Sequence, residues 1–392
     1  MRIDRIETLY ADAGWRDFAF VKITADNGLV GYSEYQEGFG SPGVSTVVQN
    51  LAPQLLGQDA MAHENLFWQL YATTRPAAGG VVAQGLGAIE NALLDLKGKH
   101  LGVPCYELLG GKLRDRIRLY WSHCGTWRVN HPAIYELEPL RSLDQVVALG
   151  KEVADRGFGA LKTNLFRFGL DNPGWTPGFN RPGGYPELNA DAPLLQDLRD
   201  ELAAFREGAG PEMDILLDTN FNYKTDGYRK IMRIADEFGL YWLELDSYDA
   251  KAVASIRQAG ATTLASCETL IGIREFRPFF DAQAMDVAII DAVWNGIWQS
   301  MKIAALAEAH EVNIAPHNFY GHLSTLMNAH FVAAVPNFRI MEIDIDNVPW
   351  QDALFTHAPE IEDGYLLLPD RPGWGTEPDE AGLAKHPPRK RR

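Results

Sequence analysis

The alternation of apolar and polar residues changes along the chain, and the change separates two kinds of structure. In the first third, β-branched and aromatic runs at residues 3–10, 18–24 and 29–35 are typical of strands. Asp26-Asn27-Gly28, between the last two runs, favours a tight hairpin turn. Apolar residues then recur at helical spacing, most clearly over residues 87–100. We therefore expect an N-terminal α+β domain.

From about residue 117, short apolar runs alternate with amphipathic helical stretches such as residues 228–238 and 301–310. The runs that we interpret as strands are residues 159–164, 214–219, 241–245, 263–266, 287–290, 312–315 and 338–341. Strands that alternate with helices indicate βαβ units and a parallel sheet. About seven or eight such units fit a closed barrel better than an open sheet. We expect the stretch after residue 364 to form a strand and turns that pack back on the first domain.

One segment breaks this pattern. Residues 169–187 contain four prolines and five glycines, together with Trp175. A loop of this length inside a compact domain is more typical of a lid or binding loop than of a plain connection. We therefore expect Trp175 to contact a ligand.

Six residues with chemically active side chains recur at or just past the ends of the expected strands. They are Asp218, Glu244, Glu268, Asp291, His317 and Glu342, and successive members are 23 to 26 residues apart. This interval is about the length of one βα unit. Because the carboxyl ends of barrel strands converge on one face, we expect all six side chains to point into one mouth.

Three of the six, Asp218, Glu244 and Glu268, are consecutive carboxylates that would repel one another without a cation. Oxygen ligands of this kind suit Mg²⁺. The alternative is that each acid caps a helix or pairs with a surface lysine. A metal-dependent hydrolase is less consistent with the sequence, because such barrels generally use histidine-rich sites and this triad contains no histidine.

Asp291 and His317 lie on neighbouring expected strands, where they can form a hydrogen-bonded pair. An acidic partner fixes the imidazole tautomer and raises its basicity, as a general base requires; a structural histidine is the alternative. Lys162 and Asn164 are two residues apart and therefore face the same side of a strand. A lysine in a barrel mouth requires an anionic group opposite it.

Composition and charge restrict the classes of partner. The 392 residues carry a net charge of −16, which argues against nucleic-acid and anionic-membrane partners. Cys105, Cys124 and Cys267 are too few and too widely spaced for a disulfide framework or a zinc set, and they suit a reducing cytoplasm. The chain shows neither a signal-peptide pattern nor an apolar run long enough to span a bilayer. We expect a cytoplasmic protein that forms a homo-oligomer and acts on a small molecule.

Over nearly its full length the chain resembles the enolase superfamily, in its mandelate racemase/muconate lactonizing enzyme branch. Residues 88–99, followed by Gly102-Val-Pro104 and residues 108–111, resemble the end of that family's capping domain. The stretches that resemble its metal-ligand strands are Leu217-Asp-Thr-Asn220, Trp242-Leu-Glu244 and Cys267-Glu-Thr269. Those that resemble its Asp–His dyad and its eighth-strand acid are Ile290-Asp291, Pro316-His317 and Met341-Glu342. Residues 364–375 are similar to its C-terminal return to the capping domain.

The resemblance implies an α/β fold, a modified TIM barrel of (β/α)₇β type over residues 117–349. An α+β capping domain over residues 1–116, completed by residues 350–392, would cover it. The implied chemistry is proton abstraction next to a carboxylate held by Mg²⁺, with a lysine or histidine as the base. Trp15, Arg16, Asn220 and Tyr320 are the residues that we expect, with Trp175, to contact substrate. Glu342 would donate a hydrogen bond to the substrate if burial raised its pKa and kept it protonated.

One residue departs from the family pattern. The second strand usually carries Lys-x-Lys, whereas this chain has Lys162-Thr-Asn164. An amide takes no proton at neutral pH, so only His317 remains as a base and two-base racemisation is disfavoured. We expect an acid-sugar dehydratase of carbohydrate-acid catabolism that forms a 2-keto-3-deoxy acid, with Lys162 against the substrate carboxylate. The alternatives are a cycloisomerase of a sugar-acid lactone or anhydro-sugar acid, and a barrel that binds a sugar acid without turning it over.

Overall fold

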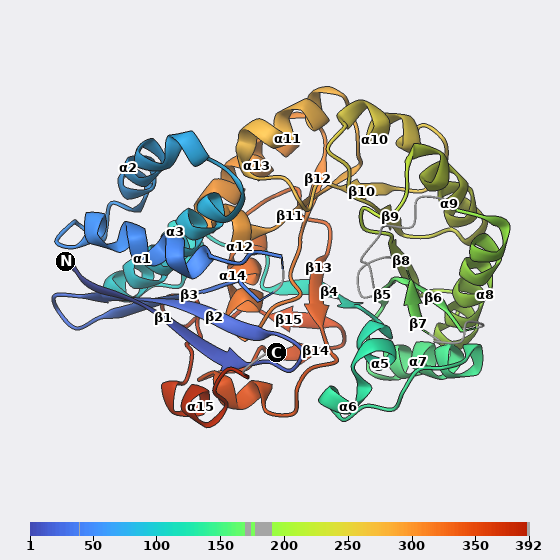
Figure 1. The fold of residues 1–392 in the computed structure, drawn as a ribbon, viewed down its shortest axis with the longest axis horizontal. Coiled ribbons are helices and arrows are strands. Elements are labelled where there is room, and N and C mark those ends of the chain that lie inside the picture. The colour runs from blue at the N-terminus through green and yellow to red at the C-terminus, as the bar shows by residue number, and fades with distance from the viewer. Residues whose placement is uncertain (39, 169–173, 177–189, 390–392) are drawn as a thin grey trace.

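An antiparallel three-stranded sheet with its helices lies beside a ring of parallel strands and outer helices (Figure 1). The computed structural model describes residues 1–38, 40–168, 174–176 and 190–389. The predicted modified barrel with an N-terminal capping domain is confirmed. Within the described residues, no helix combines the length and apolarity needed to cross a membrane. The three cysteines are free and buried.

The capping domain is built on the three strands that the sequence predicts. Its elements are β1 (Ile3–Asp12), β2 (Asp17–Ala25), β3 (Val30–Tyr35), α1 (Val44–Leu55), α2 (His63–Thr74), η1 (Arg75–Ala77), α3 (Gly80–Leu101) and α4 (Cys105–Leu108). Helix α3 begins seven residues before the predicted stretch. It lies close against β3 because Gly31 has no side chain: a Cβ there would lie 2.3 Å from the Ala92 carbonyl oxygen.

Eight parallel strands close the barrel, and they are β4 (Arg116–Ser122), β5 (Ala160–Thr163), β8 (Asp214–Asp218), β9 (Trp242–Glu244), β10 (Leu264–Ser266), β11 (Val287–Ile290), β12 (Asn313–Pro316) and β13 (Met341–Asp344). The ring closes because β13 pairs with β4, and because Ile314 of β12 makes a parallel bridge to Phe338 just before β13. The outer helices are α7 (Leu143–Asp155), α8 (Ala192–Ala209), α9 (Thr225–Phe238), α10 (Ala250–Arg257), α11 (Gly272–Asp281), α13 (Ile297–Ala309) and α14 (His322–Ala333).

Shorter elements decorate the barrel and end the chain. They are α5 (Thr126–Asn130), α6 (Pro132–Tyr135), β6 (Leu165–Arg167), β7 (Gly174–Thr176), α12 (Ala292–Asn295), η2 (Gln351–Leu354), β14 (Ile361–Glu362), β15 (Tyr365–Leu367) and α15 (Glu380–Lys385). The C-terminal segment contacts the capping domain: the Trp374 backbone N–H donates to Asp95 at 2.9 Å, and α15 packs against β1 (Figure 1). The predicted boundaries at residues 116/117 and 349/350 stay predictions.

The prediction of the last barrel strand was wrong by three residues. The apolar run at 338–341 indicated the strand, but pairing with β4 begins at Met341 and continues to Asp344. Apolarity reports burial and not backbone pairing: Ile340 is fully buried in the barrel interior before the paired segment starts. Glu342 therefore lies inside the strand and not past its end.

An apolar layer fills the barrel and determines which side chains reach its mouth. Its members are Tyr120, Ala160, Leu216, Trp242, Ala265, Val287, Ile289, Ala315 and Ile340. Side chains two residues apart on a strand face the same side. The residues two positions after Ala160, Leu216, Trp242, Ala315 and Ile340 are therefore directed into the mouth above this layer.

Two buried carboxylates of the capping domain hold the starts of two barrel helices. Glu34 of β3 accepts hydrogen bonds from the backbone N–H groups of Gly321 (2.6 Å) and Ser324 (3.0 Å) at the start of α14. Glu90 of α3 accepts one from Trp298 (3.0 Å) at the start of α13. Carboxylates at helix N-termini satisfy unpaired N–H groups and favour the helix dipole. These contacts fix the capping domain over the barrel.

Candidate active site

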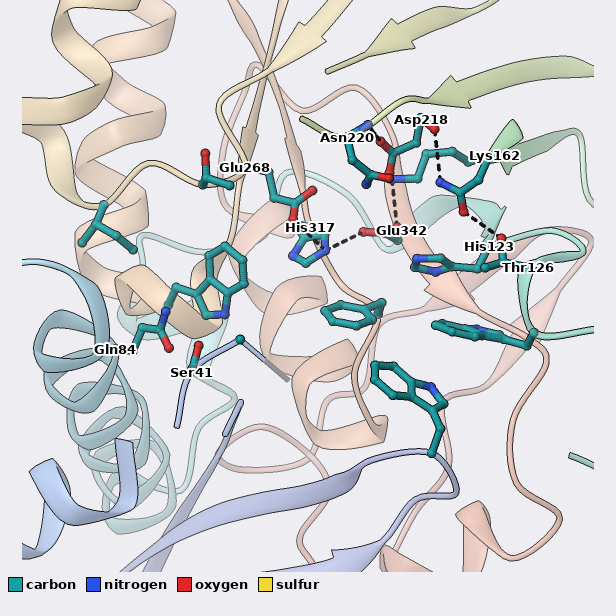
Figure 2. Close-up of a pocket in the computed structure, with 18 of the residues that line it drawn as sticks. Ser41, Gln84, His123, Thr126, Lys162, Asp218, Asn220, Glu268, His317 and Glu342 are labelled. Carbon is teal, nitrogen blue, oxygen red and sulfur yellow. Dashed lines mark hydrogen bonds and ion pairs between the residues drawn. The ribbon is translucent and has the colours of Figure 1, made fainter. Parts of the chain in front are cut away.

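A cavity of about 420 Å³ opens between the barrel mouth and the capping domain. Of the site residues predicted from sequence, those that line it are Trp15, Lys162, Asn164, Asp218, Asn220, Glu268, His317 and Glu342. All of these except Trp15 and Asn164 are labelled in Figure 2. Glu244 and Asp291 are buried beneath the lining, at 2% and 0% exposure. The strand-end pattern therefore brings its six members together in one region.

The three carboxylates of the predicted triad form a group fit for a divalent cation. One oxygen from each of Asp218, Glu244 and Glu268 lies within 4.8 Å of the others. Oε1 of Glu244 is buried and accepts no hydrogen bond from the part of the chain that the structure describes. Burial, together with Asp218, raises the pKa of Glu244 to about 8, and burial likewise raises the pKa of Glu268. A bound cation would offset the repulsion between the three carboxylates, so the donor set fits Mg²⁺.

Glu268 reaches the triad through an unusual backbone conformation. Ala265 faces the interior, so regular alternation would direct Cys267 inward as well. The backbone of Cys267 is left-handed instead, with φ at 92°, and Glu268 lines the cavity. A non-glycine residue in this conformation costs free energy, and such strain concentrates at functional sites.

Lys162 is the buried cation at the centre of the site. Its Nζ lies 3.0 Å from Glu342 Oε1, 3.1 Å from Glu244 Oε2 and 3.6 Å from Asp218 Oδ2. Burial lowers the pKa of Lys162, but the carboxylates, above all Glu244, outweigh it and raise the pKa above its usual value. Lys162 therefore stays an ammonium group.

The expectation of a raised pKa for Glu342 was wrong. Burial raises the pKa of this carboxyl, but Lys162 and then His317 lower it to well below its usual range. Its oxygens also accept hydrogen bonds from the Ser122 hydroxyl and from the Asn318 backbone N–H at 2.7 Å. Glu342 is therefore an ionised acceptor and not a hydrogen-bond donor.

His317 and Asp291 form a close pair. His317 Nδ1 lies 2.6 Å from Asp291 Oδ2, so the carboxylate accepts the Nδ1 proton and Nε2 is left to face the cavity. Burial lowers the pKa of His317, but Glu268 and Glu342 raise it to about 10. A cation on the triad would offset the charge of Glu268, and with it part of this rise. The imidazole would then titrate closer to neutrality, as a base requires.

Two residues predicted to contact substrate lie behind the cavity wall instead. The Arg16 guanidinium packs 4.2 Å from the centre of the Phe319 ring and donates to the Phe319 carbonyl oxygen. The Tyr320 hydroxyl donates to Asp291 Oδ2 at 2.5 Å, so it positions the dyad. Trp175 lies on β7, but its side chain, like most of residues 169–187, is outside the described residues.

Sequence reasoning missed several residues of the cavity. His123, Trp127 and Phe319 form with Trp15 an aromatic side of the cavity, in which the Trp15 and Trp127 rings lie 5.2 Å apart. Trp294 also lines the cavity, with its ring 5.6 Å from that of His317, and its Nε1 is buried with no hydrogen-bond partner among the described residues. One signal in the sequence could have pointed to this side of the cavity. Asp344 is two residues after Glu342 on the same strand, so the two side chains face the same side.

Two family models match the chain, one over each part of the fold. Residues 10–110 match the family model of the mandelate racemase/muconate lactonizing enzyme N-terminal domain, and residues 145–382 match the enolase C-terminal domain-like model. A D-galactonate dehydratase family member from Streptomyces bingchenggensis is 30% identical over 97% of this chain and 92% of its own.

Two solved structures are similar over nearly the whole chain. A protein from Burkholderia xenovorans strain LB400, described as a candidate L-alanine-DL-glutamate epimerase and bound to magnesium and fumarate, is 56% identical. Its TM-score is 0.96, and the match covers 99% of this chain and 97% of that one. The 3,6-anhydro-D-galactonate cycloisomerase from Zobellia galactanivorans is 25% identical with a TM-score of 0.82, covering 98% and 99%.

Proposed function

The chain belongs to the mandelate racemase/muconate lactonizing enzyme branch of the enolase superfamily, and from that premise we propose that it is a Mg²⁺-dependent acid-sugar dehydratase. The observation that carries the proposal is a one-sided arrangement of bases. His317 faces the cavity with a carboxylate behind it, whereas Asn164 stands where a second lysine would act. Relatives named as a D-galactonate dehydratase family member, a D-xylonate dehydratase and a D-gluconate dehydratase support the same reaction class.

The proposed reaction removes water from an aldonate or aldarate. Asp218, Glu244 and Glu268 would hold Mg²⁺, which would neutralise the substrate carboxylate and stabilise the charge that develops as the α-proton leaves. His317 Nε2 takes the α-proton, the bond from the β-carbon to its hydroxyl oxygen breaks, and that oxygen takes a proton from an acid of the site and departs as water. The resulting enol becomes the 2-keto-3-deoxy acid.

The polar residues around this centre hold the substrate and the base. Asp291 and Tyr320 keep Nε2 of His317 directed at the cavity. Lys162 provides positive charge near the substrate carboxylate, and Glu342 keeps Lys162 in place at 3.0 Å. Asn164 donates to the Asp218 carbonyl oxygen at 3.1 Å and accepts from Thr126 at 2.7 Å, so it is an anchored amide at the edge of the site.

The test is incubation with a library of sugar acids in D₂O, with 2-keto acids assayed by colour reaction and α-hydrogen exchange by NMR. We expect at least one acid to give a 2-keto-3-deoxy product, and His317→Asn to abolish both product and exchange. A general base contributes about 10² to 10⁴ in rate. Exchange that survives His317→Asn would contradict the base assignment, and no keto acid from any substrate would contradict the function.

Cycloisomerisation is the second candidate, favoured by the likeness to the 3,6-anhydro-D-galactonate cycloisomerase. It begins with the same α-proton abstraction but neither gains nor loses water. Mass spectrometry of the product therefore separates it from dehydration.

Epimerisation is favoured by the name of the 56% identical protein. It requires a proton donor on the face opposite His317, where Asn164 has no acid–base chemistry and Lys162 is held by three carboxylates. Dipeptide substrates that exchange their α-hydrogen and invert, as followed by chiral chromatography, would favour the epimerase.

A further inference from the structure

A second histidine–aspartate pair lies in the same cavity. His123 directly follows β4, and its Nδ1 lies 2.8 Å from Oδ1 of Asp344 on β13. Asp344 is only 6% exposed, and its other oxygen accepts a hydrogen bond from Trp127 Nε1 at 3.2 Å. The carboxylate is thereby fixed as the acceptor of the Nδ1 proton, and Nε2, on the opposite edge of the ring, is left for the cavity that His123 lines.

The two pairs approach the cavity from different directions. The His123 and His317 rings both contact Phe319, with centroids 5.7 and 4.9 Å from the Phe319 ring. Figure 2 shows Glu342 between the two histidines. A substrate in this cavity can therefore lie against both imidazoles. The His123 backbone is left-handed, with φ at 47°, a conformation that non-glycine residues adopt at a cost.

Three other polar groups of the lining, those of Lys162, Asn164 and His131, are poorly suited to give a proton. The Lys162 ammonium is shared among three carboxylates, and Asn164 is an amide with its oxygen and nitrogen both engaged. His131 also lines the cavity, but burial lowers its pKa and so favours the neutral ring. His123 differs because Asp344 holds its ring through Nδ1 and leaves Nε2 for the cavity.

We propose that His123, positioned by Asp344, is the catalytic acid that protonates the departing β-hydroxyl group. This rests on the proposed dehydration. As His317 Nε2 gains the α-proton, the β-carbon–oxygen bond breaks and its oxygen takes the proton of His123 Nε2 to leave as water. The enol hydroxyl then returns a proton to His123 while the β-carbon takes one from His317. Both histidines end as they began, and the net change is loss of one water molecule.

The variant His123→Asn tests this role, because it separates abstraction of the α-proton from loss of the β-hydroxyl group. We expect α-hydrogen exchange in D₂O to stay within about threefold of wild type, while the rate of 2-keto-acid formation falls by about 10² to 10⁴. A substrate analogue with fluorine in place of the β-hydroxyl should restore elimination, because fluoride leaves without a proton. Retained exchange also shows that the variant is folded. Asp344→Asn should change the same quantities in the same direction but less.

His322→Asn is the matched control. His322 also pairs with an aspartate, Asp352, at 2.7 Å, but it does not line the cavity, so we expect unchanged dehydration. Unchanged dehydration in His123→Asn would overturn the role of His123 but not the proposed dehydration. Joint loss of exchange, dehydration and fluoride elimination would also overturn it, since the residue would then serve α-proton abstraction or folding. A wild-type enzyme that forms no keto acid from any sugar acid would overturn the proposed function, and this role with it.

Discussion

Lys162 compensates the negative charge of the buried carboxylates around it, and its replacement by methionine tests this role. The side chain is 2% exposed, and its ammonium lies 3.0 Å from Glu342 and 3.1 Å from Glu244. Methionine retains the apolar stem but leaves these carboxylates without a cation. Removing one partner of a buried ion pair costs about 3–5 kcal/mol. We expect Lys162→Met to lower the free energy of unfolding by about 4 kcal/mol at pH 7 in the absence of added metal.

The loss of unfolding free energy in Lys162→Met should depend on pH, and the titration of Glu342 determines the direction of that dependence. Burial raises the pKa of Glu342, but Lys162 outweighs burial and the net pKa lies below its usual range. A carboxyl group whose folded pKa is lowered stabilises the protein above its unfolded pKa, about 4.3, and this contribution is lost as the pH falls through the folded pKa. The variant lacks most of this contribution. The difference between wild type and variant should therefore shrink as the pH is lowered toward and below about 4.3.

Urea unfolding followed by tryptophan fluorescence and circular dichroism, with a chelator present, measures the loss of unfolding free energy at pH 7 and its dependence on pH. Lys151→Met is the control, because Lys151 pairs with Asp155 at 2.7 Å with both side chains exposed. Such a pair contributes about 0.5 kcal/mol or less. A loss below about 1 kcal/mol for Lys162→Met at pH 7, or a loss that grows on acidification, would refute the assignment of Lys162 as the compensating buried cation.

Three further outcomes follow from the geometry. Tyr320→Phe removes a 2.5 Å hydrogen bond to Asp291, and we expect kcat to fall about tenfold with little change in KM, measured by steady-state kinetics of keto-acid formation; a change confined to KM would contradict a positioning role. Glu244→Gln should weaken Mg²⁺ binding about 100-fold or more in titration calorimetry while the circular dichroism spectrum is unchanged; wild-type affinity would exclude Glu244 as a ligand. Gly31→Ala places a Cβ 2.3 Å from the Ala92 carbonyl oxygen, so we expect a loss of about 1–3 kcal/mol in urea unfolding, and an unchanged midpoint would contradict the close packing of α3 on β3.

Strand spacing carried most of what the sequence determined. Each βα unit has nearly the same length, and side chains alternate along a strand, so Asp218, Glu244 and His317 were predictable as neighbours although they are far apart in sequence. The hairpin at Asn27-Gly28 was also a local signal, and the structure pairs β2 with β3 across it. The homo-oligomeric assembly and the cytoplasmic location stay predictions from sequence.

Tertiary structure alone decided the remaining features of the site. His123 and Asp344 are 221 residues apart and meet because barrel closure sets the first strand beside the last. Glu342 is ionised because its particular neighbours, Lys162 first, surround it with positive charge and donors, whereas burial by itself predicted the opposite. A sequence pattern fixes the direction of a side chain along its own strand. Contacts between distant strands, and the charge states that those contacts impose, exist only once the barrel is closed.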